Sequence, residues 1–347
     1  MVAKLFEGPY SYGWNGHPRP PMIEPTTSSR PPTARDCFQV HGGEGQRRSA
    51  VGTALSISVC SNRPENLAQV GHLVDTTASV DEVVLVVDLD SELVDHATLA
   101  GLEARGVKVL RNDRNRGLSF SRNRALAECA HRFLVYVDDD IVLTSDTVEA
   151  IRAAVDDGAS IVGVWLEPDF SGPIPWWLTG GQYHYLGVHH SPDLARTWGA
   201  CMTIDTQLAR DTGLRFREEL GRRGKALQSG DDTTFIAELR AAGAREQFLG
   251  DAVAHHRVSV ARTRLSYLLR RAWWQGRSEV RRDGVRTTIG KEWRRAVQTG
   301  PAATGPGRRH LLGVLYLSAV LSGVATEHVR RIAIRAGLVQ QTPDWRG

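Results

Sequence analysis

The sequence predicts an α/β fold built on a doubly wound sheet, and three observations lead to this prediction. Short apolar segments rich in β-branched residues alternate with segments of helical character between residues 55 and 165. Acidic residues directly follow several of these apolar segments, and no internal repeat is present. Strands and helices that alternate in this way form a parallel sheet with right-handed crossovers. Polar residues at the carboxyl ends of its strands line a ligand crevice.

Before residue 131 the pattern predicts three strands, each followed by a helix. Pro64 suits the first turn of the first helix, where its missing backbone N–H costs nothing. The turn after the first strand offers free backbone N–H groups to an anion. The expected strands are Leu55–Cys60, Val83–Val87 and Gly106–Leu110, and the helices run from about Pro64, from Ser91 to about Arg105, and from the turn at residues 115–123 to Ala130.

The apolar run Phe133–Val137 predicts a buried strand that ends in three consecutive acids, Asp138, Asp139 and Asp140. Neighbouring carboxylates repel one another and resist burial, so they must lie where solvent or a cation reaches them. Asp138 and Asp140 can together serve one divalent ion that keeps waters and phosphate oxygens as its other ligands. A solvated strand end before a helix cap is the alternative, and the flanking segments favour the metal site.

The segment from Glu167 to Pro192 is expected to be irregular. A loop of this length inside a compact domain usually has a function. Its aromatic residues, Trp176 and Trp177 among them, could stack on sugar faces or on apolar ligands. The alternative is that the rings pack as a small core beneath the loop. Before this segment we expect a helix at Ser145–Asp156 and a strand at Ser160–Trp165, and after it a strand at Trp198–Asp205 and a helix at Thr206–Thr212.

Two consecutive acids, Asp231 and Asp232, follow a polar loop at residues 221–228 and open a helix that reaches Ala242. One carboxylate is enough to cap a helix N-terminus, so the second is free for chemistry. A final strand at Phe248–His256 ends in two histidines, which makes its end a candidate for metal ligation.

The composition excludes several classes of protein. The chain has 347 residues, of which 41% are hydrophobic and 24% charged, as in ordinary globular proteins. Its net charge is +4 and it has no nucleic-acid-binding motif, so no nucleic acid partner is expected. Neither a GxGxxG after the first strand nor a P-loop is present. Its four cysteines form no CxxC, which indicates reduced thiols and a cytoplasmic location.

The two ends of the chain differ from its centre. Residues 1–52 are rich in Pro, Gly, Ser and Arg, lack the apolar core of a signal peptide, and are expected to be mostly disordered or loosely docked. Residues 261–347 are expected to form a helical extension, with an arginine-rich helix at 262–283. The apolar helix at Leu311–Ala325 has about 15 residues, short of the roughly 20 that span a bilayer. Peripheral contact with the inner face of the membrane is therefore left open, beside a simply solvated arginine-rich face.

Four motifs in register resemble family 2 glycosyltransferases of the GT-A fold, over about residues 54–285. The resemblance implies a doubly wound mixed sheet, with a nucleotide-binding half at 53–142 and an acceptor and catalytic half at 143–260. The motifs are Ser61-Asn62-Arg63-Pro64, then Asn115-Arg116-Gly117 with Ser121-Arg122-Asn123, then Tyr136-Val137-Asp138-Asp139-Asp140, then Ser229-Gly230-Asp231-Asp232 with His256.

The same resemblance implies an inverting transfer of sugar from a nucleotide diphosphate sugar, first of all a UDP-sugar, with Mn²⁺ or Mg²⁺ as cofactor. The acceptor would be a hydroxyl on a glycan, a lipid-linked sugar or a small natural product. Asp232 resembles the catalytic base, with Asp231 beside it. Asp140 resembles the direct metal ligand, aided by Asp138 and His256. The nucleotide-binding positions are Cys60, Ser61, Arg63, Asp88, Asp90, Arg122, Asp138 and Asp139.

The sequence departs from the family pattern at two places. The family usually has Glu-Asp where this chain has Asp231-Asp232. The second strand ends in Asp88-Leu89-Asp90, so the contact with the nucleotide base is shared between Asp88 and Asp90.

Two other functions remain open at this stage. A nucleotidyltransferase uses a similar sheet, but its glycine-rich basic loop is replaced here by Cys60–Pro64. A non-catalytic carbohydrate- or lipid-binding protein would keep the acids only to hold a metal, and the Asp231-Asp232 helix start argues against it. The sequence does not fix the donor sugar, the nucleotide base, the acceptor or the oligomeric state.

Overall fold

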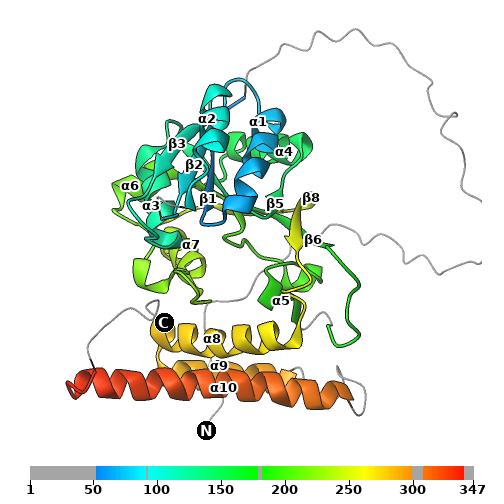
Figure 1. Ribbon diagram of the computed structural model, residues 1–347, viewed down its shortest axis with the longest axis vertical. Coiled ribbons are helices and arrows are strands. Elements are labelled where there is room, and N and C mark those ends of the chain that lie inside the picture. Colours follow the sequence, from blue (N-terminus) through cyan, green and yellow to red (C-terminus); the bar gives the residue numbers. More distant parts are fainter. Residues whose placement is uncertain (1–51, 91–92, 179–181, 299–307, 340–347) are drawn as a thin grey trace, which may run out of the picture. The chain divides into compact units, whose positions relative to one another are not determined.

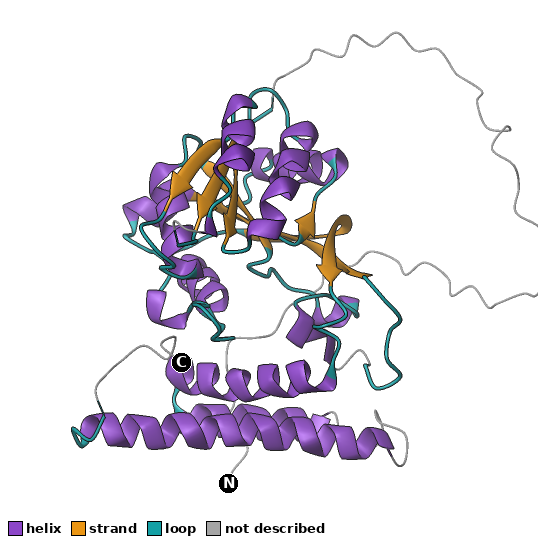
Figure 2. Ribbon diagram, viewed as in Figure 1, coloured by secondary structure: helices purple, strands orange, loops and turns teal. Residues whose placement is uncertain are grey.

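The computed structural model describes residues 52–90, 93–178, 182–298 and 308–339. Within these residues eight strands form one sheet in the order β3-β2-β1-β4-β7-β6-β8-β5 (Figures 1 and 2). Apart from Gly52, the expected N-terminal extension 1–52 lies outside the described residues. The strands are β1 (Leu55–Ser61), β2 (Glu82–Val87), β3 (Lys108–Arg111), β4 (Phe133–Asp138), β5 (Ile141–Val142), β6 (Ile161–Phe170), β7 (Cys201–Asp205) and β8 (Glu246–Val258).

The sheet is parallel on one side and mixed on the other, which confirms the predicted fold class. β1, β2, β3 and β4 run parallel to one another. β7 runs antiparallel to both β4 and β6, whereas β8 is parallel to β6. The short β5, directly after the three acids, pairs with the end of β8 and aligns Ile141 with His256. This pairing brings the late histidine to the acid cluster.

Helices cover both faces of the sheet. This explains why the sequence of β4 is an unbroken apolar run from Phe133 to Val137. Val135 and Val137 belong to one buried cluster, whereas Leu134 and Tyr136 belong to the cluster on the opposite face. A strand buried on both faces needs apolar residues at every position. The helices are α1 (Val70–Thr76), α2 (His96–Ala104), α3 (Leu118–Glu128), α4 (Ser145–Asp156), α5 (Tyr183–Leu186), α6 (Thr206–Asp211) and α7 (Asp231–Ala241), with 3₁₀ turns η1 (Pro64–Gln69), η4 (Pro192–Leu194) and η5 (Glu218–Leu220).

Some element boundaries differ from the prediction. α2 begins at His96 and not at Ser91, which lies outside the described residues, because Asp95 caps the helix and accepts a hydrogen bond from the backbone N–H of Ala97 (3.1 Å). β6 extends into the segment expected to be irregular. The remainder of that segment contributes Trp177 and Tyr183 to a third apolar cluster with the C-terminal helices, while Trp176 is exposed. Most of these rings therefore pack in a small apolar core, which was the alternative to stacking on a ligand.

The C-terminal extension is helical, as expected, and consists in the described residues of α8 (Leu265–Asp283), α9 (Val285–Gln298) and α10 (Arg308–Arg335). Figure 1 shows these three helices lying alongside one another. The prediction that the last helix has about 15 residues is wrong, because α10 has 28. The segment Leu311–Arg335 is long and apolar enough to cross a membrane. The subdivision into 53–142, 143–260 and 261–347 stays a prediction.

α8 and α10 pack backbone against backbone. A Cβ atom added to Gly276 would overlap the carbonyl oxygen of Val320, and one added to Gly323 would overlap that of Trp273. One helical turn after Gly323, the buried Glu327 pairs with Arg277 (2.9 Å) and Arg281 (2.8 Å). The two helices are thus joined by close packing and by an ion pair whose members need each other.

We expect Gly323→Ala to destabilise the protein by about 1–3 kcal/mol, because the added methyl group forces the helices apart. Gly313→Ala is the matched control, since nothing lies within 4 Å of a Cβ at that position of the same helix. There the loss of glycine flexibility should stabilise the protein by about 0.5–1 kcal/mol. Urea denaturation of both variants measures the difference, and equal stability would mean that α8 and α10 do not meet at these glycines.

Candidate active site

A small cavity of about 100 Å³ lies at the carboxyl end of β4, between the sheet, the start of α7 and α8. Residues from distant parts of the sequence line it together. They include most of the residues that the sequence singled out, namely Arg63, Arg122, Asp138, Asp140, Asp231, Asp232 and His256. Among the nucleotide-binding positions predicted, Cys60, Ser61, Asp88, Asp90 and Asp139 are not part of its lining.

Asp140 is the most heavily paired acid of this cavity. Its Oδ1 lies 3.2 Å from Nε2 of His256, and its Oδ2 lies 3.1 Å from Nη2 of Arg63 and 3.0 Å from Nη1 of Arg262. Burial acts to raise the pKa of Asp140, but the hydrogen bond and charge of His256 and the charges of Arg262 and Arg63 outweigh it and hold the pKa far below its ordinary value. Asp140 is therefore ionised at neutral pH.

Asp139 is not part of the cavity lining and instead holds the loop after β1. It accepts a hydrogen bond from Oγ of Ser61 (2.5 Å) and pairs with Arg63. Burial and the nearby Asp140 raise the pKa of Asp139 to about 6, against the opposing charge of Arg63. Its contacts thus fix Ser61 and Arg63, which the sequence had predicted as nucleotide-binding positions.

Arg122 joins the two acid pairs of the cavity. This buried guanidinium donates to Oδ2 of Asp231 (3.0 Å), to Oδ1 of Asp138 (3.1 Å) and to the carbonyl oxygen of Gly199 (2.7 Å). Asp138 comes from the strand end and Asp231 from the first turn of α7. One cation therefore spans the carboxylates that the sequence assigned separately to the nucleotide and to the acceptor.

The two acids that begin α7 have different surroundings. Asp231 is buried and accepts from Oγ of Ser119 as well as from Arg122, and burial raises its pKa. Asp232 is half-buried and accepts from the backbone N–H groups of Gly199 (2.9 Å) and Thr233 (2.7 Å).

The pKa of Asp232 is lowered. Burial acts to raise it, but the charge of Arg122 outweighs that effect, helped by the two backbone N–H donors. The helix N-terminus also favours the charged form. Asp232 is thus an ionised carboxylate at the cavity wall, with its partner Asp231 engaged in positioning Arg122.

Comparison with known proteins agrees with this geometry. The model of the family described as glycosyl transferase family 2 matches residues 57–214, from β1 to the residues just after α6. Residues 57–214 thus form a family 2 glycosyltransferase region. It resembles the glucosyl-dolichyl phosphate glucuronosyltransferase of Haloferax volcanii, with 25% identity over 65% of this chain and 76% of that protein. It also resembles the succinoglycan biosynthesis protein ExoM of Rhizobium meliloti, with 26% identity over 65% of this chain and 74% of that protein.

Among solved structures, this glycosyltransferase is similar to S. aureus TarS. The similarity covers 83% of this chain and 46% of that chain, with 16% identity and a TM-score of 0.47. Residues 1–349 of TarS have also been solved in complex with UDP and with UDP-GlcNAc.

The carboxylate of Asp88 is already occupied in this glycosyltransferase. It accepts hydrogen bonds from Nδ2 of Asn112 (2.7 Å) and from the backbone N–H groups of Arg116 (2.7 Å) and Gly117 (2.8 Å). It thereby fixes the turn into α3. Asp90 is exposed, and Asn115 donates to it (3.3 Å). Asp90 therefore remains more accessible to a nucleotide base than Asp88.

Cys60 also lies off the cavity lining. Burial raises the pKa of its thiol to about 12, so the sulfur stays protonated. Its side chain packs against the apolar cluster that contains Tyr136. Its backbone lies near the end of β1 and pairs with Asp138 of β4.

Sequence reasoning missed three arginines that line the cavity: Arg222, Arg262 and Arg271. Arg262 donates to the carboxylate of Asp140 and to the carbonyl oxygen of Leu186 (2.7 Å). Arg271 reaches the cavity from α8. The available signals were the polar loop at 221–228 for Arg222 and the arginine-rich segment at 262–283 for the other two. Neither signal places the side chains until α8 is seen to fold back over the cavity.

The residues around Asp140 fit a divalent cation bound mainly through its substrate. Among the described residues no group of three His, Cys, Asp or Glu side chains is close enough together to hold a metal. Asp140 and His256 nevertheless converge, and a carboxylate oxygen together with waters and phosphate oxygens is the usual ligand set of such an ion. The predicted set of Asp138, Asp140 and His256 is thus not preassembled as a triad, since Asp138 pairs with Arg122.

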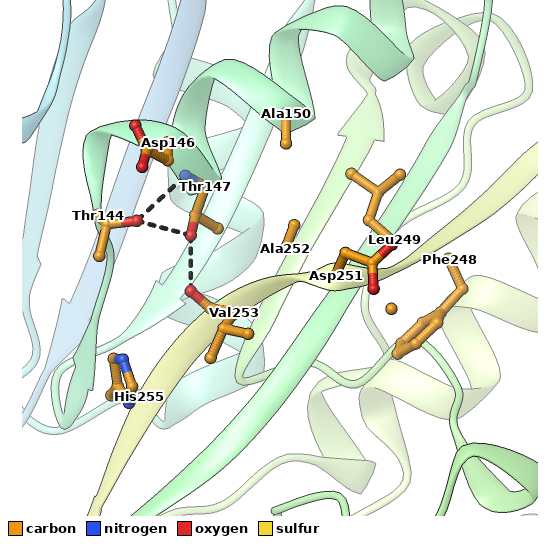
Figure 3. A pocket seen from close by; sticks show the side chains of 11 residues that line it. Thr144, Asp146, Thr147, Ala150, Phe248, Leu249, Asp251, Ala252, Val253 and His255 are labelled. Atoms are coloured by element: carbon orange, nitrogen blue, oxygen red, sulfur yellow. Dashed lines mark hydrogen bonds between the residues drawn. The ribbon is translucent and has the colours of Figure 1, made fainter. Parts of the chain in front are cut away.

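A larger hollow of about 500 Å³ lies elsewhere, between the first turn of α4 and β8 (Figure 3). The β6–β8 register shifts between Val164 and Trp165, and β8 bulges there. Oγ1 of Thr147 donates to the carbonyl oxygen of Val253 (2.6 Å), which ties α4 to this bulge. Of the two histidines that the sequence singled out at the end of β8, His255 lines this hollow, but the predicted acids and arginines do not, so size alone does not indicate where the chemistry occurs.

Proposed function

We propose that this glycosyltransferase moves a sugar from a nucleoside diphosphate sugar, preferentially a UDP-sugar, to an acceptor hydroxyl. The transfer inverts the configuration at the anomeric carbon. The observation that supports this most is that Asp140 and Asp232 line one cavity, with Arg122 between their two regions. A site that holds a diphosphate at one end and an ionised base at the other suits a single displacement. The preference for UDP rests on the family resemblance.

In this mechanism the bond between the anomeric carbon and the diphosphate oxygen breaks while the bond to the acceptor oxygen forms. Asp232 takes the proton of the acceptor hydroxyl as it attacks, because its low pKa keeps it ionised. The electron pair of the broken bond goes to the diphosphate. Arg63 and Arg262, now bonded to Asp140, can pass to the phosphate oxygens and stabilise that charge.

A divalent ion, Mn²⁺ or Mg²⁺, would be held by Asp140 and His256 and would supply Lewis-acid stabilisation of the leaving diphosphate. The cavity is small, about 100 Å³, because the two arginines reach into the acid cluster. Donor binding therefore requires these side chains to move.

The proposal is tested by incubating the protein with UDP-glucose and Mn²⁺ and measuring UDP release, first alone and then with acceptor present. A panel of other nucleotide sugars, screened by thermal shift, identifies the donor, because a tightly bound donor raises stability by mass action. Failure to bind any nucleotide sugar, with or without the metal, would contradict the proposed function.

We propose further that the acceptor is a lipid-linked sugar at a membrane surface. One curated relative is named for a lipid-linked substrate, glucosyl-dolichyl phosphate. The second support comes from α10, whose outer face is apolar. Leu311 is 62% exposed and Val329 is 64% exposed. The remaining exposed apolar residues follow the helical repeat, at Val314, Leu315, Leu321 and Ile332.

No exposed position between Leu311 and Ile332 carries Asp, Glu, Lys or Arg. A helix face in water is normally charged, so a face of this length needs a partner. The opposite face of α10 packs on α8 through Gly323 and Glu327, so the helix would lie on a bilayer and not cross it. Arg335, exposed at the end of α10, and Arg286, exposed on α9, favour anionic lipid as that partner.

We expect Val329→Glu to weaken binding to phosphatidylcholine–phosphatidylglycerol vesicles by about tenfold, because a charge replaces an apolar side chain that would enter the bilayer. Leu93→Glu is the matched control, since Leu93 is 58% exposed on a loop near α2. Co-sedimentation measures both variants. Equal binding of Val329→Glu and the parent protein would contradict membrane docking through α10, as would a dimer that only this variant disrupts.

A further inference from the structure

The charges around the cavity do not balance locally. Three acids of the lining form ion pairs. Asp140 pairs with Arg63 and Arg262, whereas Asp138 and Asp231 share Arg122. Asp232 accepts two backbone N–H groups. Arg222 and Arg271 also line the cavity, and neither forms an ion pair within the described residues. Two guanidinium groups thus line the cavity without a carboxylate at ion-pair distance.

Arg271 shows this most clearly, because it is only 6% exposed. Its Nη1 donates to the carbonyl oxygen of Leu227 (3.1 Å) and to Oγ of Ser229 (3.3 Å), both neutral acceptors. Its Nε has no hydrogen-bond partner. Burial and the nearby Arg222 lower the pKa of Arg271 to about 10. A buried cation without a counter-charge is costly, so the arrangement calls for an anion.

The position of these arginines indicates which anion they serve. Arg271 bonds to residues 227–229, the segment that leads directly into Asp231 and Asp232. The backbone carbonyl of Arg222 accepts from Leu118, at the start of α3 (2.8 Å). The donor's diphosphate has Arg63 and Arg262 at Asp140. The unpaired charge therefore lies on the side of the cavity where the proposed base receives the acceptor.

We propose that Arg222 and Arg271 form a subsite for a phosphate group carried by the acceptor. This inference rests on the proposed function and deepens it, since it names a phosphate-bearing acceptor. Two guanidinium groups offer paired N–H donors that match phosphate oxygens, and a phosphate held there would place the acceptor next to Asp232.

The test is the binding of hexyl phosphate to full-length protein in the presence of UDP and Mn²⁺, measured by calorimetry. Arg222→Gln removes one guanidinium whose side chain donates no hydrogen bond within the described residues, so the fold should remain intact. We expect this variant to bind hexyl phosphate about tenfold more weakly than the parent protein. Lys225→Gln, an exposed cation in the same loop but outside the cavity lining, is the control and should bind normally.

A second titration separates the two sources of phosphate. UDP with Mn²⁺ should bind Arg222→Gln as well as it binds the parent protein. Unchanged affinity for hexyl phosphate, or a loss of UDP affinity in this variant, would overturn the acceptor subsite. Absence of UDP binding in the parent protein would instead count against the proposed function, while the hexyl phosphate titration would still report on the arginines.

Discussion

Asp232→Asn is expected to lower sugar transfer by about 10²–10⁴-fold, the usual contribution of a general base. The amide keeps the size of the carboxylate and can still accept a hydrogen bond from Gly199 or Thr233. It cannot accept the proton of the acceptor hydroxyl at neutral pH. Binding of UDP should survive, because Asp232 does not contact the residues that surround Asp140.

Transfer rate and UDP affinity must both be measured for this variant, since only their combination identifies a base. Asp146→Asn provides the matched control, because Asp146 also lies in the first turn of a helix, α4, but is exposed and outside the cavity lining. The control should retain full activity. Near-normal turnover by Asp232→Asn would assign the proton transfer to another group.

Asp140→Ala is expected to abolish the dependence of UDP binding on Mn²⁺. Asp140 is the acid on which Arg63, Arg262 and His256 converge, and its low pKa keeps it available as a ligand. Without it, His256 alone remains as a protein ligand near the diphosphate. We expect the affinity for UDP in the presence of Mn²⁺ to fall by at least about tenfold, as losses around metal sites commonly do.

Calorimetry with and without a chelator distinguishes this effect from general damage. Chelation should weaken UDP binding by the parent protein and leave Asp140→Ala unchanged. The Asp146→Ala control should behave like the parent protein, since its exposed carboxylate lies outside the cavity lining. Metal-dependent binding that persists in Asp140→Ala would place the cation elsewhere.

The central sheet could be predicted because its sequence signals are local. From Phe133 to Val137 the residues of β4 alternate between two buried clusters, so each of these positions is apolar and the strand is easily identified from the sequence. The length of α10 could not be predicted in this way. After Ala325 its sequence turns polar, yet the helix continues because Glu327 pairs with Arg277 and Arg281, about fifty residues earlier in the chain.

In the candidate site, too, local sequence signals could be used for prediction, whereas contacts between distant residues could not. Asp138, Asp140 and Asp232 could be predicted because a strand end and a helix start are visible in the sequence. The link between them, Arg122 bonded to both Asp138 and Asp231, depends on α3 bringing Arg122 to the end of β4 and the start of α7. Arg271 could not have been assigned to the site at all, since it reaches the cavity only because α8 folds back upon it.

The proposed mechanism requires a metal ion at Asp140 and a base at Asp232 to act on the same sugar. Crystals grown with Mn²⁺ and an unreactive analogue of the donor would locate the ion by its anomalous scattering. We predict an ion bonded to Asp140 and to the diphosphate, with Asp232 facing the anomeric carbon from the side opposite the leaving group. An ion bound away from Asp140, or an anomeric carbon turned away from Asp232, would contradict the account.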